Sequence, residues 1–490
     1  MTAAEAPNDA TARRGREQAA LWLALAFSAL ATLPFWVAPT PQLTDYPSHL
    51  ARYVVMLDGG RDAFLARYYD FEWMLNGNLG ADLLMVPLGR MMGAETAAWL
   101  IGMLLPALTG LGIIAVSRAV YGRVGFGAVL AFATIWSPAM GMGFYNFCLA
   151  LACALLAFAL WVRMDAVRWR WAVFLPVGVL VWLCHASGWG VLGVLVFGYE
   201  WGRRKSWRAF VAPWPLLLAL VPQLMAPAAK GSLEYGANVV RYKTLVWFQA
   251  LRDQDMIADV TTLAVIGLAV LFALLCRRVD GRLGWAALIL GLLTIVMPRH
   301  LGGGDYADYR LIAVTLMIGA LAIDARPPLA LWLIAPALFL WRLELTTLGW
   351  IRNGARTQQA LEALDHIPRG AKVASAVLIE TRGWALDPLE HVTSFATVRR
   401  AVLTNAHFAI PGIHMLRLRE GGPGFADPSH RVFHHPGRPV DLSAFPPARR
   451  ADWLWYVGTR VPDRLPPGAV VTWRGQGGLV ARLAKSPAPR

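Results

Sequence analysis

A succession of long apolar runs, separated by short loops rich in arginine, constrains the fold of this chain more than any other feature. Each run has about 17–22 residues, the length of helix that crosses a hydrocarbon core of about 30 Å. Every backbone amide inside such a core must be hydrogen-bonded within its own segment, so the runs must be helices. The sequence therefore predicts an all-α polytopic membrane helix bundle with about 11–12 spans.

The predicted membrane domain covers residues 19–349. Its candidate spans are the apolar runs at 19–38, 96–117, 124–140, 143–162, 171–186, 188–201, 209–226, 257–276, 284–298, 310–324 and 328–348. A weaker apolar stretch at 79–92 predicts a short or re-entrant helix. Whether this helix crosses the membrane stays open. Composition agrees, because 57% of the residues are hydrophobic and 16% are charged, against roughly 45–50% and about 25% in soluble domains.

The basic loops predict the orientation of the chain, because cytoplasmic loops carry an excess of Lys and Arg. They lie at Arg13–Arg16, Arg118–Arg123, Arg163–Arg170, Arg203–Arg208, Arg277–Arg282 and, more weakly, Asp324–Arg326. The net charge of +15 is thereby explained by membrane topology and contact with lipid headgroups, and nucleic-acid binding is not expected. We expect residues 1–18 to form a cytoplasmic tail and the loops 39–78, 227–256 and 299–309 to be exoplasmic.

Residues 350–490 differ in composition and contain no spanning run. Short apolar segments predict strands at Lys372–Ile379, Trp453–Gly458 and Ala469–Thr472, and Thr357–Asp365 is typical of a helix. The Gly-, Pro- and His-rich stretch Arg419–Pro439 predicts a loop. We therefore expect a small exoplasmic α/β domain after the bundle.

The first candidate site follows the first span, in the segment Thr44–Arg52. If a helix begins there, Asp45, His49 and Arg52 share one face. A carboxylate beside a cation at the membrane surface can take a proton from a hydroxyl, or can help to hold a divalent ion such as Mg²⁺ or Mn²⁺. Asp45 before a proline is equally typical of a helix N-cap.

The second candidate site is the loop Pro298–Arg310, which carries Arg299, His300, Asp308 and Arg310 around three consecutive glycines. Arginine binds phosphate through a planar fork, and glycines allow close approach of the backbone. The alternative is that Arg299 and Arg310 extend toward lipid headgroups.

Other polar residues predict less. Residues that could line a cavity at this exoplasmic end are Glu72, Tyr145, Asn146, His185 and Asp308, although a capped or water-bonded His185 is the commoner arrangement. His430, His434 and His435 have metal-like spacing, but their Gly/Pro-rich surroundings indicate solvated side chains. The four cysteines lie in apolar runs and are interpreted as small buried hydrophobes without a disulfide or metal site.

Phosphate-binding and catalytic signatures of soluble enzymes are absent from the sequence. It contains no GxxxxGK[ST] loop, no GxGxxG turn, no GxSxG elbow and no HExxH helix. A reaction that depends on a cytoplasmic nucleotide therefore has no site in this chain. Any enzyme here should use a donor that is already in the membrane.

Together these features resemble the GT-C superfamily of polytopic glycosyltransferases, which includes the protein mannosyltransferases and the lipid A aminoarabinose transferases. Asp45 lies in the first exoplasmic loop, Arg310 ends a late exoplasmic loop, and Leu454–Gly458 reads Leu-Trp-Tyr-Val-Gly in the last domain. The chain is more closely similar to a bacterial group of GT-C-like proteins with Asp-Tyr-Pro-x-His-Leu-Ala-Arg at 45–52 and Gly-Phe-x-Asn-Phe at 143–147.

The resemblance implies a multi-pass protein of the bacterial inner membrane, with a cytoplasmic N-terminus and a periplasmic C-terminus. It implies transfer of a sugar from a polyprenyl-phosphate carrier to a glycan, lipid or protein acceptor, with Asp45 as general base. The residues His49, Arg52, Arg299, His300 and Arg310 would bind the donor phosphate. Tyr46 replaces the second acidic residue of several families, so metal dependence stays open.

Two other functions remain open: a transporter or flippase of a lipid-linked glycan, and a non-catalytic protein of envelope assembly. A transporter should carry charged groups and broken helices near mid-membrane. In this sequence the charges collect at the exoplasmic rim, which favours catalysis there.

Overall fold

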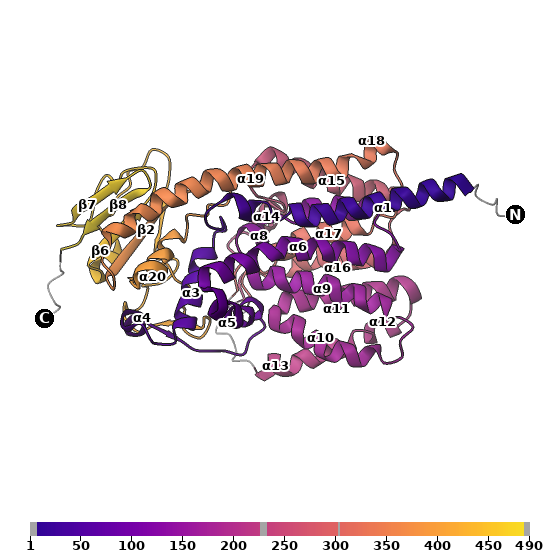
Figure 1. Cartoon of the computed structure of the whole chain (residues 1–490), viewed down its shortest axis with the longest axis horizontal. Coiled ribbons are helices and arrows are strands. Elements are labelled where there is room, and N and C mark those ends of the chain that lie inside the picture. Colours follow the sequence, from indigo (N-terminus) through magenta and orange to yellow (C-terminus); the bar gives the residue numbers. More distant parts are fainter. Residues whose placement is uncertain (1–6, 226–232, 302–303, 485–490) are drawn as a thin grey trace.

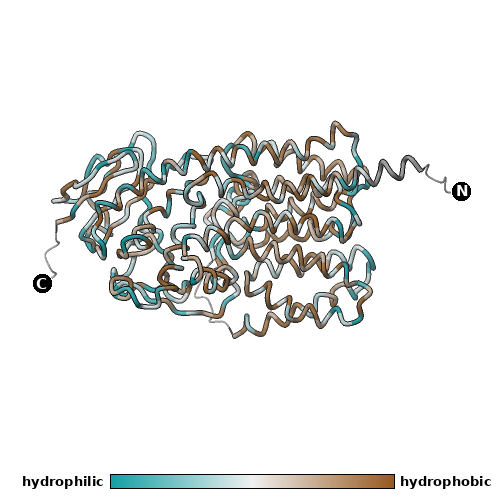
Figure 2. The backbone as a smooth tube through the Cα atoms, in the orientation of Figure 1, coloured by the Kyte–Doolittle hydropathy of each residue, from teal (hydrophilic) through white to brown (hydrophobic). Residues whose placement is uncertain are grey.

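The computed structural model describes residues 7–225, 233–301 and 304–484. Roughly parallel helices form a long bundle, and a small sheet covers one end of it (Figure 1). The first helix, α1 (Pro7–Leu30), begins at the opposite end of the molecule from the sheet. Figure 2 shows hydrophobic residues along the middle of the bundle and hydrophilic segments at both of its ends, as expected for helices surrounded by lipid.

The bundle is built from α1 and α2 and from the helices α6 to α19. Their bounds are α1 Pro7–Leu30, α2 Pro34–Val37, α6 Ala94–Tyr121, α7 Phe126–Ala131, α8 Pro138–Gly141, α9 Tyr145–Arg163, α10 Arg170–Cys184, α11 Ala186–Arg204, α12 Arg208–Val211, α13 Leu220–Met225, α14 Val239–Phe248, α15 Met256–Leu275, α16 Gly281–Val296, α17 Tyr309–Leu321, α18 Leu329–Trp332 and α19 Ile334–Leu361.

Six helical segments in the described part of the chain are long and apolar enough to cross a membrane, by length and composition. They are Glu17–Val37, Ala94–Tyr121, Tyr145–Arg163, Arg208–Met225, Met256–Leu275 and Leu329–His366. Four shorter apolar helical segments accompany them at Phe126–Gly141, Arg170–Cys184, Gly281–Val296 and Tyr309–Leu321. The chain is thus compatible with a multi-pass membrane protein, while the count of long spans is lower than the expected 11–12.

Several expected spans differ from the helices that form. The run at 124–140 is divided into α7, the 3₁₀ turn Phe132–Thr134 (η1) and α8, because Ser137 precedes a proline and adopts an extended conformation. The run at 209–226 is divided into α12, the 3₁₀ helix Trp214–Ala219 (η2) and α13. The stretch at 79–92 forms one short helix, α5 (Gly80–Met92).

The basic loops meet at the end of the bundle away from the sheet. Arg123 pairs with Asp324 at 2.5 Å and Arg203 pairs with Asp165 at 2.5 Å. The backbone of Asp280 donates to Ala322 at 2.8 Å. The loops that the charge pattern assigns to one side therefore do lie together, although the side chains of Arg13, Arg14 and Arg16 are outside the described residues.

The loop 39–78 and the chain after α19 form the other end of the molecule. The loop carries α3 (Tyr46–Asp58), α4 (Ala63–Tyr68) and β1 (Tyr69–Phe71). β1 pairs antiparallel with β4 (Leu416–Leu418), which belongs to the C-terminal part. The first loop and the C-terminal region are therefore one folded unit.

The main sheet is mixed, with the order β3-β2-β6-β8-β7, and β5 also pairs with β2. Its strands are β2 Lys372–Glu380, β3 Leu403–Thr404, β5 Arg431–His434, β6 Trp453–Val457, β7 Val470–Gly475 and β8 Gly478–Arg482. The short helix α20 (Phe395–Arg400) and the 3₁₀ turns Val392–Ser394 (η4) and Pro446–Arg450 (η5) lie between strands. The three predicted strands are confirmed. The prediction of a loop at Arg419–Pro439 is wrong in part, since β5 lies inside it.

The boundary expected at residue 350 falls inside α19. This helix continues past the apolar run to Leu361 and is followed by the 3₁₀ turn Glu362–His366 (η3), which together cover the helix expected at Thr357–Asp365. The polar residues Arg352 to Gln359 are good helix formers apart from Asn353, Gly354 and Thr357. One helix therefore joins the bundle to the sheet.

Candidate functional site

Asp45 lies at the start of α3, where the sheet end of the molecule meets the bundle. It occupies the N-cap position and Pro47 lies in the first turn, but its side chain makes no capping hydrogen bond. Its backbone N–H donates to the carbonyl of Met142 at 2.9 Å. The carboxylate instead faces His391, with 3.5 Å between Asp45 Oδ1 and His391 Nδ1. Asp45 therefore occupies an N-cap position, as one alternative expected, but its side chain does not cap the helix.

His391 comes from the C-terminal domain, directly before η4, and its side chain is 1% exposed. Its Nδ1 lies 3.2 Å from the carbonyl oxygen of Thr44, and its Nε2 lies 3.2 Å from Asp427 Oδ1. Burial of the ring opposes its charged form. The hydrogen bond to Asp427 and the charges of Asp45 and Glu390 outweigh that cost and raise the pKa of His391.

Burial also governs the acidity of Asp45. Removal of its carboxylate from water raises its pKa to about 7, against the opposing charge of His391. Glu390 and Asp427 add to the increase through repulsion of like charges. A carboxyl group with a pKa near neutrality accepts a proton more readily than an ordinary aspartate does.

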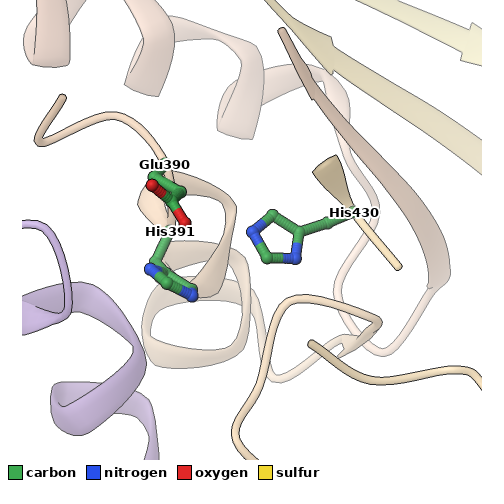
Figure 3. A group of neighbouring side chains, drawn as sticks. All are labelled: Glu390, His391 and His430. Atoms are coloured by element: carbon green, nitrogen blue, oxygen red, sulfur yellow. The ribbon is translucent and has the colours of Figure 1, made fainter. Parts of the chain in front are cut away.

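Glu390, Asp427, His430 and Arg431 complete a cluster around His391. Arg431 pairs with Glu390 at 2.8 Å and donates to Asp427 at 3.0 Å. His430 is fully buried and lies beside β2, where its carbonyl accepts from the N–H of Val377. Figure 3 shows Glu390, His391 and His430 gathered at one place. The prediction that His430 and His434 are solvated is wrong, since both are buried, whereas His435 is exposed.

Arg310 reaches the same region from α17. Its guanidinium carbon lies 4.2 Å from the centre of the Phe144 ring. Its Nη1 lies 2.8 Å from His185 Nε2, and its Nη2 donates to the carbonyl of Asp305 at 3.1 Å. Its Nε is buried without a hydrogen-bond partner. The side chain therefore turns inward rather than extending to headgroups.

His185 faces two hydrogen-bond donors, the N–H of Ser187 and Nη1 of Arg310, and a neutral imidazole can accept from one of them. As the N-cap of α11, its Nδ1 accepts from the N–H of Ser187 at 3.0 Å. A neutral imidazole has one acceptor nitrogen, and that contact uses it. The Nε2 then carries the proton and meets a second donor in Arg310. His185 is thus capped, as one alternative expected, and the guanidinium lacks a full acceptor partner there.

The turn Met142–Phe144 links Asp45 to Arg310. Met142 accepts from the Asp45 N–H, and a Cβ on Gly143 would come within 3.7 Å of the Asp45 nitrogen. Gly143 has a positive φ of 85°, which favours glycine in this turn. The Arg310 guanidinium lies over the ring of Phe144. The two candidate sites, far apart in the sequence, therefore meet at this turn.

Arg52 and His49 have partners of their own. Arg52 pairs with fully buried Asp82 at 2.9 Å, and Asn146 donates to the same carboxylate at 3.0 Å. Asn146 also accepts from the N–H of Ala81. His49 lies against Phe408, with 5.6 Å between ring centres, and its burial keeps the pKa well below the usual value. Arg52 therefore connects α3 to α5 and α9, and its charge is already balanced.

The remaining residues of the second candidate site are also paired. Arg299 makes two contacts with Asp305, at 2.8 and 2.9 Å, and His300 lies 3.3 Å from the same carboxylate. Asp308 is fully buried and pairs with Lys243 at 2.5 Å. Gly302 and Gly303 lie outside the described residues. Among the three arginines expected to bind the phosphate, all of which the structure describes, Arg310 is the one without a carboxylate partner.

Glu72 and Tyr145 each have a partner of their own. Glu72 is 54% exposed and pairs with Arg417 across the β1–β4 ribbon at 2.5 Å. The buried hydroxyl of Tyr145 donates to the carbonyl of Ala98 at 3.2 Å. Glu72 is thus a surface residue, and Tyr145 connects α9 to α6.

Sequence reasoning missed Glu390, His391, Asp427 and Arg431. They follow short or irregular elements of the C-terminal domain, where no periodicity marks a side chain as buried. The pairs Glu390-His391 and His430-Arg431 were the available signal, since adjacent acidic, imidazole and basic residues are unusual in a small apolar core.

Comparisons of this chain with protein-family models, with curated proteins and with solved structures find no match.

Proposed function

We propose that this chain is a membrane glycosyltransferase of GT-C type, which moves a sugar from a polyprenyl-phosphate carrier to an acceptor hydroxyl. The observation that carries the proposal is the meeting of Asp45 and Arg310 at the turn Met142–Phe144. A carboxylate and an inward-turned guanidinium at one end of an apolar bundle suit a substrate whose lipid lies in the membrane and whose phosphate lies at its surface.

Asp45 serves as the general base. Its carboxylate is 15% exposed, is not used for capping and is not paired with an arginine. It takes the proton of the acceptor hydroxyl as the acceptor oxygen bonds to the anomeric carbon of the sugar. A single displacement of this kind inverts the anomeric configuration.

Arg310 stabilises the leaving group. The bond between the anomeric carbon and the phosphate oxygen breaks, and its electron pair stays on the phosphate, whose negative charge grows. The unpartnered Nε of Arg310 and the poorly matched contact at His185 leave donors that can turn to that charge. A planar guanidinium can bind two phosphate oxygens at once.

A transporter is less well supported. The buried Arg342–Asp259 ion pair joins α19 to the first turn of α15, and the indole of Trp384 donates to the same aspartate at 2.7 Å. Trp384 belongs to the C-terminal part of the chain, so this pair lies at the sheet end of the bundle. A transporter would need its charges near mid-membrane.

The test is glycan analysis of a strain that lacks the chain. Mass spectrometry of its envelope glycans and lipid A should show one species lighter by one sugar unit. The wild-type chain and Asp62→Asn should restore that species, and Asp45→Asn should not. Asp62 is the matched control, since it caps α4 in the same loop and pairs with Arg369. Restoration by Asp45→Asn, or unchanged glycans in the deletion strain, would refute the proposal.

Activity of purified protein separates a transferase from a flippase. Detergent micelles contain no compartments, so a flippase has nothing to move there. Transfer of the sugar that the deletion strain lacks, from its lipid carrier to its acceptor in micelles, supports the transferase. A complete lack of transfer under conditions that keep the protein folded would favour the flippase.

A further inference from the structure

Glu390, His391 and His430 bring three metal-ligand groups together in the C-terminal domain. One donor atom of each residue lies within 4.8 Å of the donor atoms of the other two (Figure 3). Ligand atoms about 2.0–2.1 Å from a tetrahedral zinc ion lie about 3.3–3.4 Å apart, so the three side chains must move closer together when an ion binds. The residues come from two separate segments, before η4 and before β5.

His430 provides an independent observation at the same place. Its side chain is fully buried, and neither ring nitrogen makes a hydrogen bond of good geometry. Its Nδ1 lies 3.7 Å from Asp427 Oδ1, beyond hydrogen-bond distance. A buried polar group without a partner costs about 1–3 kcal/mol, so such a group calls for an explanation.

His391 is oriented as metal-bound histidines are. Its Nδ1 faces the backbone carbonyl of Thr44 at 3.2 Å, and an N–H donated there leaves Nε2 to bind an ion in place of its hydrogen bond with Asp427. Metal-ligating histidines almost always donate their second ring N–H to a carbonyl or carboxylate in this way. The Nε2 side of the ring holds Asp427 Oδ1, which also lies next to His430.

We propose that Glu390, His391 and His430 bind a transition-metal ion, and that the donor set favours zinc. Two imidazoles and one carboxylate are a common zinc set, whereas Mg²⁺ prefers oxygen ligands. Asp427 lies beside both histidines, with its Oδ1 3.2 Å from His391 Nε2 and 3.7 Å from His430 Nδ1. When the ion binds, the Nε2 proton of His391 is released to solvent. Arg431, which pairs with Glu390 and Asp427, then keeps Asp427 as its partner.

The metal site lies one imidazole away from Asp45, because His391 Nδ1 is 3.5 Å from the Asp45 carboxylate. An ion there ties the C-terminal domain to the first loop through His391 and Thr44. The site does not depend on sugar transfer. The protein can therefore transfer sugar without binding metal, and it can bind metal without transferring sugar.

The test is zinc binding by the full-length protein in detergent, after removal of metals with a chelator. Competition with a chromophoric zinc chelator should give one tight equivalent for the wild type. His430→Gln and Glu390→Gln should each bind zinc at least tenfold more weakly. His435→Gln is the matched control, since it is exposed and outside the cluster, and it should bind as the wild type does.

Two further measurements keep the result clear if His430→Gln folds poorly. Zinc should raise the thermal midpoint of the wild type and of His435→Gln more than that of Glu390→Gln, whose side chain is 21% exposed. Co²⁺ bound to the wild type should give visible bands typical of nitrogen and oxygen ligands. Wild-type protein without a tight zinc equivalent, or equal zinc affinity in the wild type and both variants, would overturn the proposal.

Discussion

Asp45 and Arg310 contact the same turn: the Asp45 N–H donates to the Met142 carbonyl at 2.9 Å, and the Arg310 guanidinium lies 4.2 Å from the Phe144 ring centre. Within the described residues, the Asp45 carboxylate has no Lys or Arg nitrogen within 4 Å, and the Arg310 guanidinium has no carboxylate within 4 Å. Arg52, Arg299 and Asp308 each have such a partner. Asp45 and Arg310 are therefore available to a substrate, whereas Arg52, Arg299 and Asp308 stabilise the fold.

Replacing Asp45 by Asn should remove sugar transfer and leave the fold intact. The amide has the shape of the carboxylate but cannot take a proton, and loss of a general base costs on the order of 100–10,000-fold in rate. The measurement is the turnover of lipid-linked sugar by protein in detergent. Asp62→Asn should keep its activity, and a rate for Asp45→Asn within a few-fold of wild type would rule out the base.

Replacing Arg310 by Lys should weaken use of the lipid-linked donor at least tenfold. Lysine keeps the charge but has no planar fork for two phosphate oxygens. The comparison is Arg299→Lys, because Arg299 is already held by Asp305 through two contacts. The readout is the KM for the donor. Equal KM values for the two variants would show that Arg310 does not bind the phosphate.

Replacing Asp82 by Leu should destabilise the protein strongly. Arg52 would remain buried without its partner, which costs about 3–5 kcal/mol. Changing both residues, to Arg52→Met with Asp82→Leu, should recover much of that loss because no charge is left unpaired. Thermal unfolding in detergent measures both effects. Asp70→Asn, at an exposed pair with Arg419, should change little. A double variant as unstable as Asp82→Leu alone would contradict this account.

His407 should make the protein less stable in acid. Burial lowers its pKa to about 3, and an unfolded histidine has a pKa of about 6.5. The unfolded state therefore binds more protons between these values, and stability falls as the pH drops below about 6.5. From pH 7.5 to pH 5 this residue alone should cost about 2 kcal/mol.

The measurement for His407 is the change of the unfolding midpoint between pH 7.5 and pH 5. His407→Gln removes the titrating group, although it can lower the midpoint at both pH values through lost packing. Its drop on acidification should be smaller than that of wild type. An identical drop in both proteins would show that another group causes the acid sensitivity.

Local sequence patterns predicted most of the long apolar helices and the strands β2, β6 and β7. They also marked Asp45 and Arg310 as candidate site residues, and the structure places both against one turn. Periodicity and length carry that information because each element buries its own apolar face. The partners of the charged residues could not be predicted. His391 meets Asp45 from the far end of the chain, and Arg299 is neutralised by Asp305 in its own loop. Such contacts depend on how the elements are placed in space.

The break in the run at 124–140 and the length of α19 also escaped prediction. The first follows from Ser137-Pro138, a dipeptide that disfavours helix but that membrane spans can tolerate. The second follows from helix-forming polar residues beyond the apolar run. Hydropathy indicates where a chain leaves the hydrocarbon core of the membrane. Where a helix ends depends instead on prolines and on the helix propensity of the polar residues that follow.

The 28 residues of α19 run without interruption from the bundle toward the sheet, over a length of about 42 Å. A continuous helix transmits rotation and tilt along its axis, whereas a flexible linker would not. If lipids or a neighbouring protein tilt the apolar half of α19, the imidazole of His391 should shift relative to Asp45.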